Sequence, residues 1–367
     1  MADGSMVIKL MRSDSAPIFG APLRAGLRAL SWGYLAAISA RNFGFDSGLI
    51  DAAKLPHPVV SVGNITTGGT GKTPMVLHVA NLLCELNRKP CILTRGYKPR
   101  SDQAARPDTF SDEAVLMQEA LGARGHVQVG SDRFKAGLTA IEAAPSLNCF
   151  IMDDGFQHRQ LARDLDIVLV DAGMHAGLWD LLPRGMFREP ASSLKRASLV
   201  IITRADQVSP RFEGRLDLLE AWITRHRGKP ADGRCTHAWD GFVDQSGQVY
   251  GADELKSETS IHAVCALGNP DSFFAMTRNH ANPTAKVQTI ALPDHHGFAT
   301  LAELERRVLK PAADAGGCVV TSEKDWVKWR GLVKSQELQV RVYRPKLAIK
   351  FIGADPLPGA LKDLFVK

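Results

Sequence analysis

The chain has 367 residues, of which 45% are hydrophobic and 23% are charged. This composition is typical of a globular protein and excludes a disordered or collagen-like chain, while the length favours two domains over one. The formal net charge of +6 suits an anionic partner.

The first predicted element is a helix over residues 18–41. Its apolar side chains recur at helical spacing: Phe19, Leu23, Leu27, Leu30, Tyr34, Leu35 and Ile38. Arg24, Arg28 and Arg41 add basic charge and Trp32 adds an aromatic ring. This pattern indicates either a basic amphipathic helix in a membrane interface or a helix docked on the protein's own core. No run of 18 apolar residues predicts a membrane-spanning helix.

Strand and helix patterns alternate along the rest of the chain. Buried strands are expected at 58–62, 91–94, 127–129, 149–152, 167–170 and 199–203, and helices at 72–87, 112–121 and 132–143. A polar segment at 225–233 predicts a linker. Beyond it, strands are expected at 235–239, 261–267, 287–292, 318–321 and 338–343, and helices at 272–277 and 300–313.

This alternation favours the α/β class, with a parallel sheet covered by helices on both faces. We expect three parts: an N-terminal helix region at 1–45, a main domain at 46–228 and a second, smaller α/β domain at 229–367.

A glycine-rich segment joins the first strand to the first helix of the main domain. Its residues are Thr66, Thr67, Gly68, Gly69, Thr70, Gly71, Lys72 and Thr73. Such a turn exposes successive backbone N–H groups, and the helix N-terminus adds positive charge, so the segment suits a phosphate. Apart from Thr66, where glycine is usual, it follows the P-loop pattern G-x-x-x-x-G-K-[ST]. We therefore expect ATP as cofactor, with Lys72 on its β- and γ-phosphates and the Thr73 hydroxyl on Mg²⁺.

Two acids, Asp153 and Asp154, end the apolar run at 149–152. A carboxylate is needed at this place in a P-loop protein to hold Mg²⁺. Asp154 is the first choice as metal ligand beside Thr73, with Asp153 as a second acid. The alternative is a pair of solvated acids at a strand end. The parallel sheet is thus expected to be of the P-loop NTPase type.

At this point the sequence resembles a known family. Residues 61–74 are similar to the phosphate loop of the tetraacyldisaccharide 4'-kinases, the lipid A 4'-kinases, in which the first glycine is also replaced. Further similar motifs follow in order: Thr94-Arg95-Gly96-Tyr97, Ser111-Asp112-Glu113, Asp153-Asp154-Gly155-Phe156-Gln157-His158, Leu182-Pro183-Arg184-Gly185, Arg188-Glu189-Pro190, Gly268-Asn269-Pro270, Pro293-Asp294-His295-His296 and Lys324-Asp325.

The resemblance implies a kinase that transfers the γ-phosphate of ATP to the 4'-hydroxyl of a tetraacylated glucosamine disaccharide 1-phosphate. The acceptor is a lipid made at the cytoplasmic face of the bacterial inner membrane. The resemblance thus favours a peripheral protein whose N-terminal helix contacts the membrane surface.

It also implies a catalytic pair. Asp112 resembles the family's general base, and His295 resembles the histidine that pairs with it. From the residues alone, Asp112 is better explained as a helix N-cap than as a base, whereas His295 is equally well explained as a loop histidine. His296 could take the place of His295. The two lie on different predicted domains, so their meeting is expected to require domain closure.

Five further residues are candidates for substrate contact. Arg95 and Tyr97 end a strand at the carboxyl edge of the sheet, where ligands bind in such folds. His158 would face the same cleft if its turn continued as a helix; otherwise it is a packing residue. Arg188 and Glu189 follow a loop rich in proline and glycine and are expected to contact the acceptor or a phosphate.

A competing hypothesis is a P-loop switch or chaperone that acts on a protein partner. It explains the phosphate loop and the two acids equally well, but not the pair of Asp112 and His295 or the amphipathic start. Nucleic acid is not an expected partner, because no module of aromatic and basic residues is present. No obligate protein partner is evident.

Overall fold

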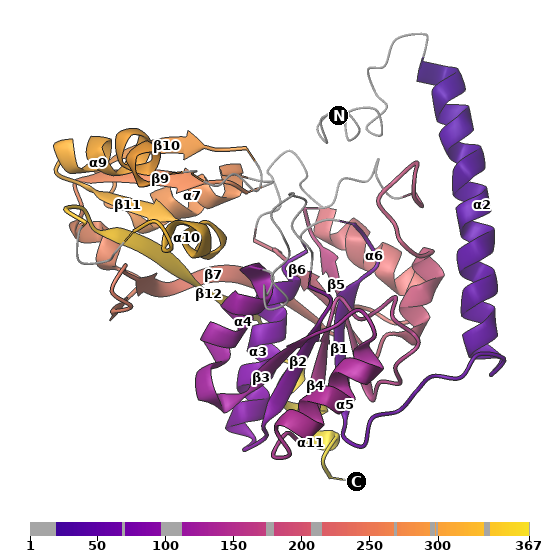
Figure 1. Cartoon of the computed structure of the whole chain (residues 1–367). Helices are drawn as coiled ribbons and strands as arrows, with labels where there is room; N and C mark the ends of the chain where they lie inside the picture. Colours follow the sequence, from indigo (N-terminus) through magenta and orange to yellow (C-terminus); the bar gives the residue numbers. More distant parts are fainter. Residues whose placement is uncertain are drawn as a thin grey trace. The chain divides into compact units, whose positions relative to one another are not determined.

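The computed structural model describes residues 20–67, 70–96, 112–173, 180–206, 215–267, 270–293, 298, 300–333 and 338–366. The chain forms two compact units (Figure 1). The first comprises Met1–Lys98, Ala120–His237 and Ile349–Lys367, and the second Pro99–Glu119 and Ala238–Ala348. Both are built of parallel strands and helices, which confirms the predicted α/β class.

The sheet of the first unit places the phosphate loop. Its strands are β1 (Val59–Asn64), β2 (Pro90–Thr94), β3 (His126–Val129), β4 (Cys149–Asp153), β5 (Leu165–Asp171) and β6 (Leu199–Thr203). They are parallel and lie in the order β6-β5-β1-β4-β2-β3. Strand β1 is central, and its residues are buried on both faces, as expected for a covered parallel sheet. The loop after β1 thus starts at the middle of the carboxyl edge.

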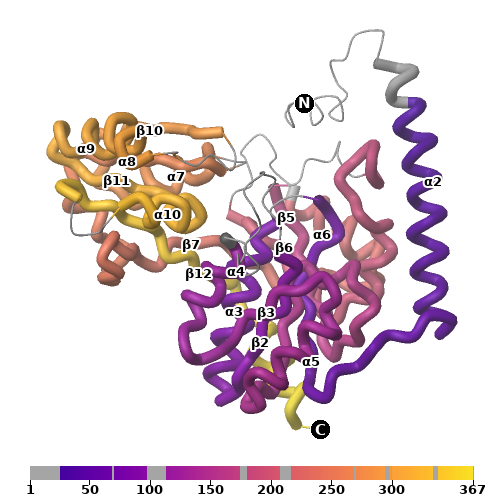
Figure 2. The backbone as a smooth tube through the Cα atoms, in the orientation of Figure 1, coloured from indigo at the N-terminus to yellow at the C-terminus, as the bar shows by residue number. Residues whose placement is uncertain are grey.

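Helices cover this sheet on both faces. Helix α3 (Lys72–Glu85) packs on β1, β2 and β4, and α5 (Arg133–Ala143) packs on β2 and β3. Alternate strand residues such as Val59 and Phe150 share a core with Ala136 and Ala140 of α5. The remaining elements are α2 (Gly20–Asp46), η1 (Gly122–Arg124), η3 (Ala191–Arg196), α6 (Arg215–Arg227) and α11 (Leu357–Asp363). Helix α11 lies on α3, so the C-terminal end of the chain returns to the first unit (Figure 2).

The second unit is also built on parallel strands. Its strands are β9 (Ser260–Cys265), β10 (Lys286–Ala291), β11 (Cys318–Thr321) and β12 (Val342–Ile352), in the order β10-β9-β11-β12. Strand β7 (Gly233–Val243) pairs with β8 (Val249–Tyr250) in a hairpin. The helices are α4 (Asp112–Leu121), η5 (Glu254–Ser257), α7 (Pro270–His280), α8 (Leu301–Leu304), η6 (Glu305–Leu309), α9 (Lys310–Asp314) and α10 (Glu323–Trp329). Separate apolar cores form around Phe274 and around Trp329.

The units depart from the sequence-based boundaries in three ways. Residues 225–233 are no linker, because Arg227 is buried and donates hydrogen bonds to the carbonyl oxygens of Pro230 and Ser198, both at 2.9 Å. The chain instead leaves the first unit within β7 and returns within β12. Helix α4, as far as Glu119, groups with the second unit.

Two predicted elements of the second unit also differ in detail. The helix expected at 300–313 contains a π-helical turn, η6, between α8 and α9. The strand expected at 338–343 starts only at Val342 and extends to Ile352.

Candidate functional site

The phosphate loop leaves β1 at Asn64 and enters α3 at Lys72. Gly71 precedes the helix with φ 82° and ψ 28°, a left-handed conformation that favours glycine. A Cβ atom at Gly71 would also lie 2.1 Å from Cε1 of His237, so no larger residue fits there. Gly68 and Gly69, the other predicted loop glycines, lie outside the described residues.

Buried hydrogen bonds brace the two ends of the loop. The Asn64 side-chain amide donates to the Thr70 hydroxyl at 2.9 Å, and the Thr203 hydroxyl donates to the Thr70 carbonyl at 3.0 Å. The Gln157 amide donates to the Asn64 carbonyl at 2.9 Å. Side chains from β6 and from the turn after β4 therefore hold the loop in place.

The start of the loop is paired with a segment much later in the chain. Thr66 forms an isolated antiparallel bridge with Phe187, and the Thr67 N–H donates to the Met186 carbonyl at 2.7 Å. Thr66 does not have a positive φ. Glycine is therefore not required at Thr66, which explains the departure from the usual pattern.

One carboxylate lies between two cations at the mouth of the loop. Asp154 accepts from Nη1 of Arg188 at 3.0 and 2.8 Å, and Nζ of Lys72 lies 3.4 Å from Oδ1 of Asp154. Burial raises the pKa of Asp154, but the charges of Lys72 and Arg188 outweigh it, so the pKa lies below its ordinary value. All three side chains remain partly exposed, which makes them accessible to a ligand. The structure thus joins Lys72, Asp154 and Arg188, which are far apart in the sequence.

Asp153 is the more buried of the two acids, with 8% of its surface exposed. The Thr94 hydroxyl donates to its Oδ2 at 3.1 Å. The charges of Asp153 and Asp154 act on Arg133, whose pKa is lowered by burial to about 10. Arg133 is a further candidate for the site, which the sequence analysis did not single out. Its position just after β3, at the same sheet edge as Arg95 after β2, was the signal that could have found it.

Comparison with known proteins identifies the family. The family model of tetraacyldisaccharide-1-P 4'-kinase matches residues 23–364. This chain belongs to that family. A tetraacyldisaccharide 4'-kinase of Anaeromyxobacter dehalogenans is 37% identical, covering 89% of this chain and 87% of the relative. One of Pelobacter propionicus is 33% identical, covering 87% and 86%.

A solved structure of the family is also similar. The "apo" form of LpxK from Aquifex aeolicus in complex with ATP has a TM-score of 0.70 and 28% identity, covering 94% of this chain and 99% of that one. The predicted family, the P-loop kinase fold and the enzyme class, a phosphotransferase acting on a hydroxyl, are confirmed.

His158 does not lie on a helix. The sequence analysis expected it to face the cleft only if its turn continued as a helix. Its N–H donates to the Gly155 carbonyl at 2.8 Å in a tight turn after β4. Burial lowers the pKa of His158 to about 4, and the charges of Arg133, Arg163 and Arg95 add to this effect. The imidazole in this kinase is therefore neutral near pH 7 and lies in a basic environment. Arg95 itself is exposed at the end of β2.

Glu189 has no exposed surface. It accepts hydrogen bonds from Arg196 at 2.8 and 3.2 Å and from the Asn42 amide at 3.0 Å. These contacts favour a structural part for Glu189 over the expected contact with acceptor or phosphate.

The predicted catalytic pair is only partly described. Asp112 is the first residue of α4, but its side chain lies outside the described residues, as do His295, His296 and Tyr97. Helix α4 up to Glu119 groups with residues 238–348. Domain closure is therefore not needed to bring α4 into the unit that also carries residue 295.

Proposed function

We propose that this chain transfers the γ-phosphate of ATP to the 4'-hydroxyl of a tetraacylated glucosamine disaccharide 1-phosphate. The observation that carries the assignment of the donor site is the cluster of Lys72, Asp154 and Arg188 at the mouth of a braced phosphate loop. Two cations and a helix N-terminus provide the charge that a triphosphate needs.

The residues at this site fit ATP with Mg²⁺. Gly71 adds no side chain of its own at the start of α3, and Lys72 and Arg188 have no other acidic partner than Asp154 among the described residues. Thr73, Asp154 and Asp153 would hold the metal. When bound, ATP supplies the phosphoryl group, and the metal neutralises part of its charge.

Lys72 and Arg188 would bind the phosphate oxygens and stabilise the charge that develops on them during transfer. Arg133 and the neutral His158 extend this basic environment. Arg95 or Tyr97 would donate a hydrogen bond to the lipid acceptor, because both residues follow the carboxyl end of β2, where ligands bind in such sheets.

We propose Asp112 as the general base and His295 as the residue that orients it. A sugar hydroxyl has a high pKa, so transfer needs a group that accepts its proton. What supports Asp112 is its place at the start of α4, where the helix dipole favours the ionised carboxylate. The next residue, Glu113, pairs with Lys324 of α10, which anchors the start of α4 within the second unit. His296 is the alternative partner.

Helix α2 is the proposed contact with the membrane surface at the cytoplasmic face. No helix in the described ranges is long and apolar enough to cross a bilayer. Helix α2 exposes three large apolar side chains: Leu30 at 63%, Trp32 at 65% and Phe43 at 65%. No acidic residue lies between them in the sequence, so the exposed part of α2 suits the interface of a membrane that carries the lipid acceptor.

A kinase assay tests the function. Purified protein, ATP and Mg²⁺ are incubated with a tetraacyldisaccharide 1-phosphate, and the lipid is analysed by mass spectrometry. We expect one added phosphate on the lipid, with loss of at least 100-fold in kcat for Lys72→Ala and Asp112→Asn. Phosphate release that does not depend on the lipid, without a phosphorylated product, would favour the P-loop switch instead. Normal turnover of a folded Asp112→Asn protein would exclude Asp112 as base.

A further inference from the structure

Helix α2 contacts both segments that carry the ion pair of Arg188 and Asp154. We call residues 180–190 the arginine strap and residues 154–163 the acid turn. The strap and the turn are separated in sequence by β5, and both lie in the first unit with α2 (Figure 1). The distance between Arg188 and Asp154 therefore depends on how these two segments are held together.

The first half of α2 binds the arginine strap. Ser31 Oγ donates to the Leu181 carbonyl at 3.0 Å and accepts from the Arg184 N–H at 3.2 Å. One turn later, the Tyr34 hydroxyl donates to the carbonyl oxygen of Arg188 itself at 2.9 Å. The backbone near both ends of the strap is thus hydrogen-bonded to the same helix.

Asn42 binds both segments at once. Its side-chain amide donates to Glu189 Oε2 in the strap at 3.0 Å, while its backbone carbonyl oxygen accepts from Arg159 of the acid turn at 3.1 Å. Arg159 also pairs with Asp46 at 2.6 Å. Asn42 has 9% of its surface exposed, and its hydrogen bond with Glu189 is buried and so shielded from water.

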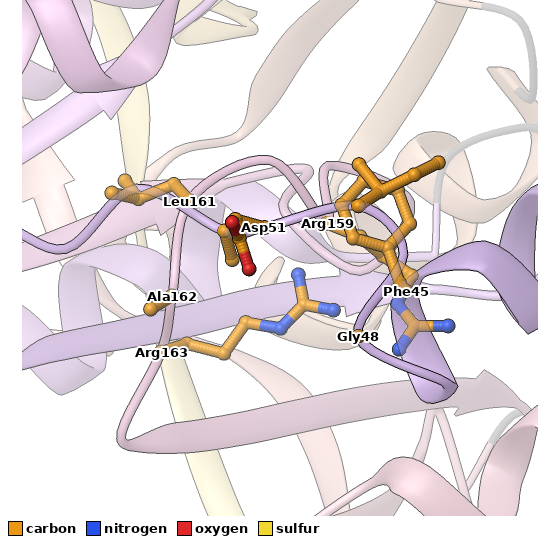
Figure 3. A pocket seen from close by; sticks show the side chains of 9 residues that line it. Phe45, Gly48, Asp51, Arg159, Leu161, Ala162 and Arg163 are labelled. Carbon is orange, nitrogen blue, oxygen red and sulfur yellow. The ribbon is translucent and has the colours of Figure 1, made fainter.

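Arg159 and Arg163 line a depression of about 330 Å³ near the end of α2 (Figure 3). Both arginines make contacts that hold the acid turn in place. Arg159 lies with its guanidinium carbon 5.1 Å from the centre of the Phe45 ring. Arg163 pairs with Asp166 at 3.0 Å and donates to the carbonyl of Gly155, the residue after Asp154, at 3.0 Å. Both guanidinium groups are engaged in holding the acid turn, so the depression offers no open anion site.

The other edge of the strap is attached to the phosphate loop. The Arg188 N–H donates to the Ile65 carbonyl at 2.8 Å, and the Thr67 N–H donates to the Met186 carbonyl at 2.7 Å. A continuous set of hydrogen bonds therefore leads from α2 through Arg188 to the loop.

We infer that Tyr34 and Asn42 are positioning residues of the phosphate site, which set the place of Arg188 relative to Asp154 and the loop. We call the side of α2 that carries Ser31, Tyr34 and Asn42 its inner side. This side supports phosphoryl transfer by holding the strap. The inference rests on the proposed phosphate contact of Arg188. It predicts that removing the hydrogen bonds of Tyr34 or Asn42 displaces Arg188 and so lowers kcat, while the protein stays folded.

The test measures kcat for Asn42→Ala and Tyr34→Phe with ATP and tetraacyldisaccharide 1-phosphate in detergent micelles. We expect a decrease of about tenfold for each, which corresponds to about 1.4 kcal/mol in the barrier. In an Arg188→Ala background, the same substitutions should change kcat by less than twofold, because the side chain that they position is gone. Ser39→Ala is the matched control: Ser39 lies on α2 and is exposed, and its replacement should not affect kcat.

Three results are decisive. Unchanged kcat in Asn42→Ala and Tyr34→Phe, with a large loss in Arg188→Ala, overturns the positioning role and leaves the phosphate contact of Arg188 standing. An equal decrease in kcat with Arg188 present and with Arg188→Ala also overturns it. Such a decrease would not depend on Arg188 and would indicate a general structural defect. Unchanged kcat in Arg188→Ala removes the proposed phosphate contact and the inference with it.

Discussion

Single residues at the phosphate loop balance charge before any ligand is bound. Lys72 and Arg188 lie close to the same carboxylate, Asp154, which offsets their mutual repulsion. A triphosphate at the proposed donor site would compete with this carboxylate for the two cations. On that proposal, we expect Asp154 to weaken the binding of free ATP and to favour a complex that also holds a metal ion, which the carboxylate would ligate.

Asp154→Asn should separate these two effects. Without Mg²⁺, in EDTA, we expect the variant to bind ATP several-fold more tightly than the natural protein, because Lys72 and Arg188 are released from a competing anion. Isothermal titration calorimetry measures this affinity. The exposed Asp51, replaced by Asn, is the control. Equal or weaker ATP binding by Asp154→Asn would contradict the competition.

His237 gives a second prediction, on pH dependence. Burial lowers its pKa from 6.5 to about 4, and its Nε2 has no hydrogen-bond partner among the described residues. The unfolded chain therefore binds a proton at a higher pH than the folded protein does. Stability must then rise with pH between about 4 and 6.5, by up to about 2 kcal/mol from pH 5 to neutrality.

Replacing His237 by Gln removes this contribution. We expect the free energy of unfolding in urea to fall less between pH 7.5 and pH 5 in His237→Gln than in the natural protein. His126, for comparison, lies half-buried on β3, and its replacement should not flatten the dependence as much. Identical pH dependence with and without His237 would show that the imidazole is not the titrating group.

Sequence reasoning located the residues of the site that are contiguous or follow strand ends. The phosphate loop and Asp154 were predicted because the pattern is local. The contacts of Gly71 with His237 and of Asp154 with Arg188 were not predicted, since the order of the strands, rather than sequence spacing, brings them together.

At the scale of elements, periodicity predicted most strands and helices of both units. Periodicity was misleading where the contacts of a particular side chain, rather than the hydrophobic pattern, determine the structure of a segment. The polar segment 225–233 reads as a linker, but Arg227 binds it to the end of η3 and so continues the first unit. The N-terminal helix was predicted with two alternatives. Its hydrogen bonds with residues 181–189 show that α2 docks on the rest of the first unit, while its exposed Leu30, Trp32 and Phe43 leave the membrane contact as a proposal.

Arg227 should be the main support of the connection between α6 and β7. Its side chain pairs with Asp232 at 2.5 Å and is almost fully buried. Arg227→Ala removes the charged partner closest to that carboxylate, which keeps the Val200 N–H as a donor at 2.7 Å. It also removes the Arg227 donors to the carbonyl groups of Pro230 and Ser198, so we expect a loss of roughly 2–4 kcal/mol in unfolding free energy. Thermal unfolding measures it.

The exposed Arg225, two residues earlier on the same helix, is the matched control, and Arg225→Ala should alter stability by less than about 0.5 kcal/mol. Equal effects of the two substitutions would show that the buried contacts of Arg227 contribute little.

At the scale of the whole molecule, the second unit consists of two segments inserted in the first, Pro99–Glu119 and Ala238–Ala348. The chain leaves the first unit within β7 and returns within β12, and the last helix, α11, packs on α3. Leu357 and Leu361 of α11 are fully buried, and Asp355 pairs with His78 of α3 at 3.1 Å. The C-terminal residues therefore belong to the support of the helix that starts with Lys72.

Leu361→Ala should destabilise the first unit by roughly 2–4 kcal/mol, because it leaves a cavity between α11 and the rest of the core. We expect lower ATP occupancy near the melting temperature, with unchanged ATP affinity of the folded protein at lower temperature. The neighbouring Lys362 is exposed, and Lys362→Ala should have neither effect. A variant Leu361→Ala that melts like the natural protein would contradict the packing of α11 on the nucleotide unit.

The order of the segments also affects synthesis on the ribosome. The residues of the phosphate loop are made long before the helix that packs on α3, which consists of residues 357–363. A nascent chain therefore carries α3 without its α11 partner until these residues have been made. We expect the nascent kinase to bind nucleotide stably only once α11 has docked, and we expect the apolar surface that α11 covers on α3 to be open to chaperones until then.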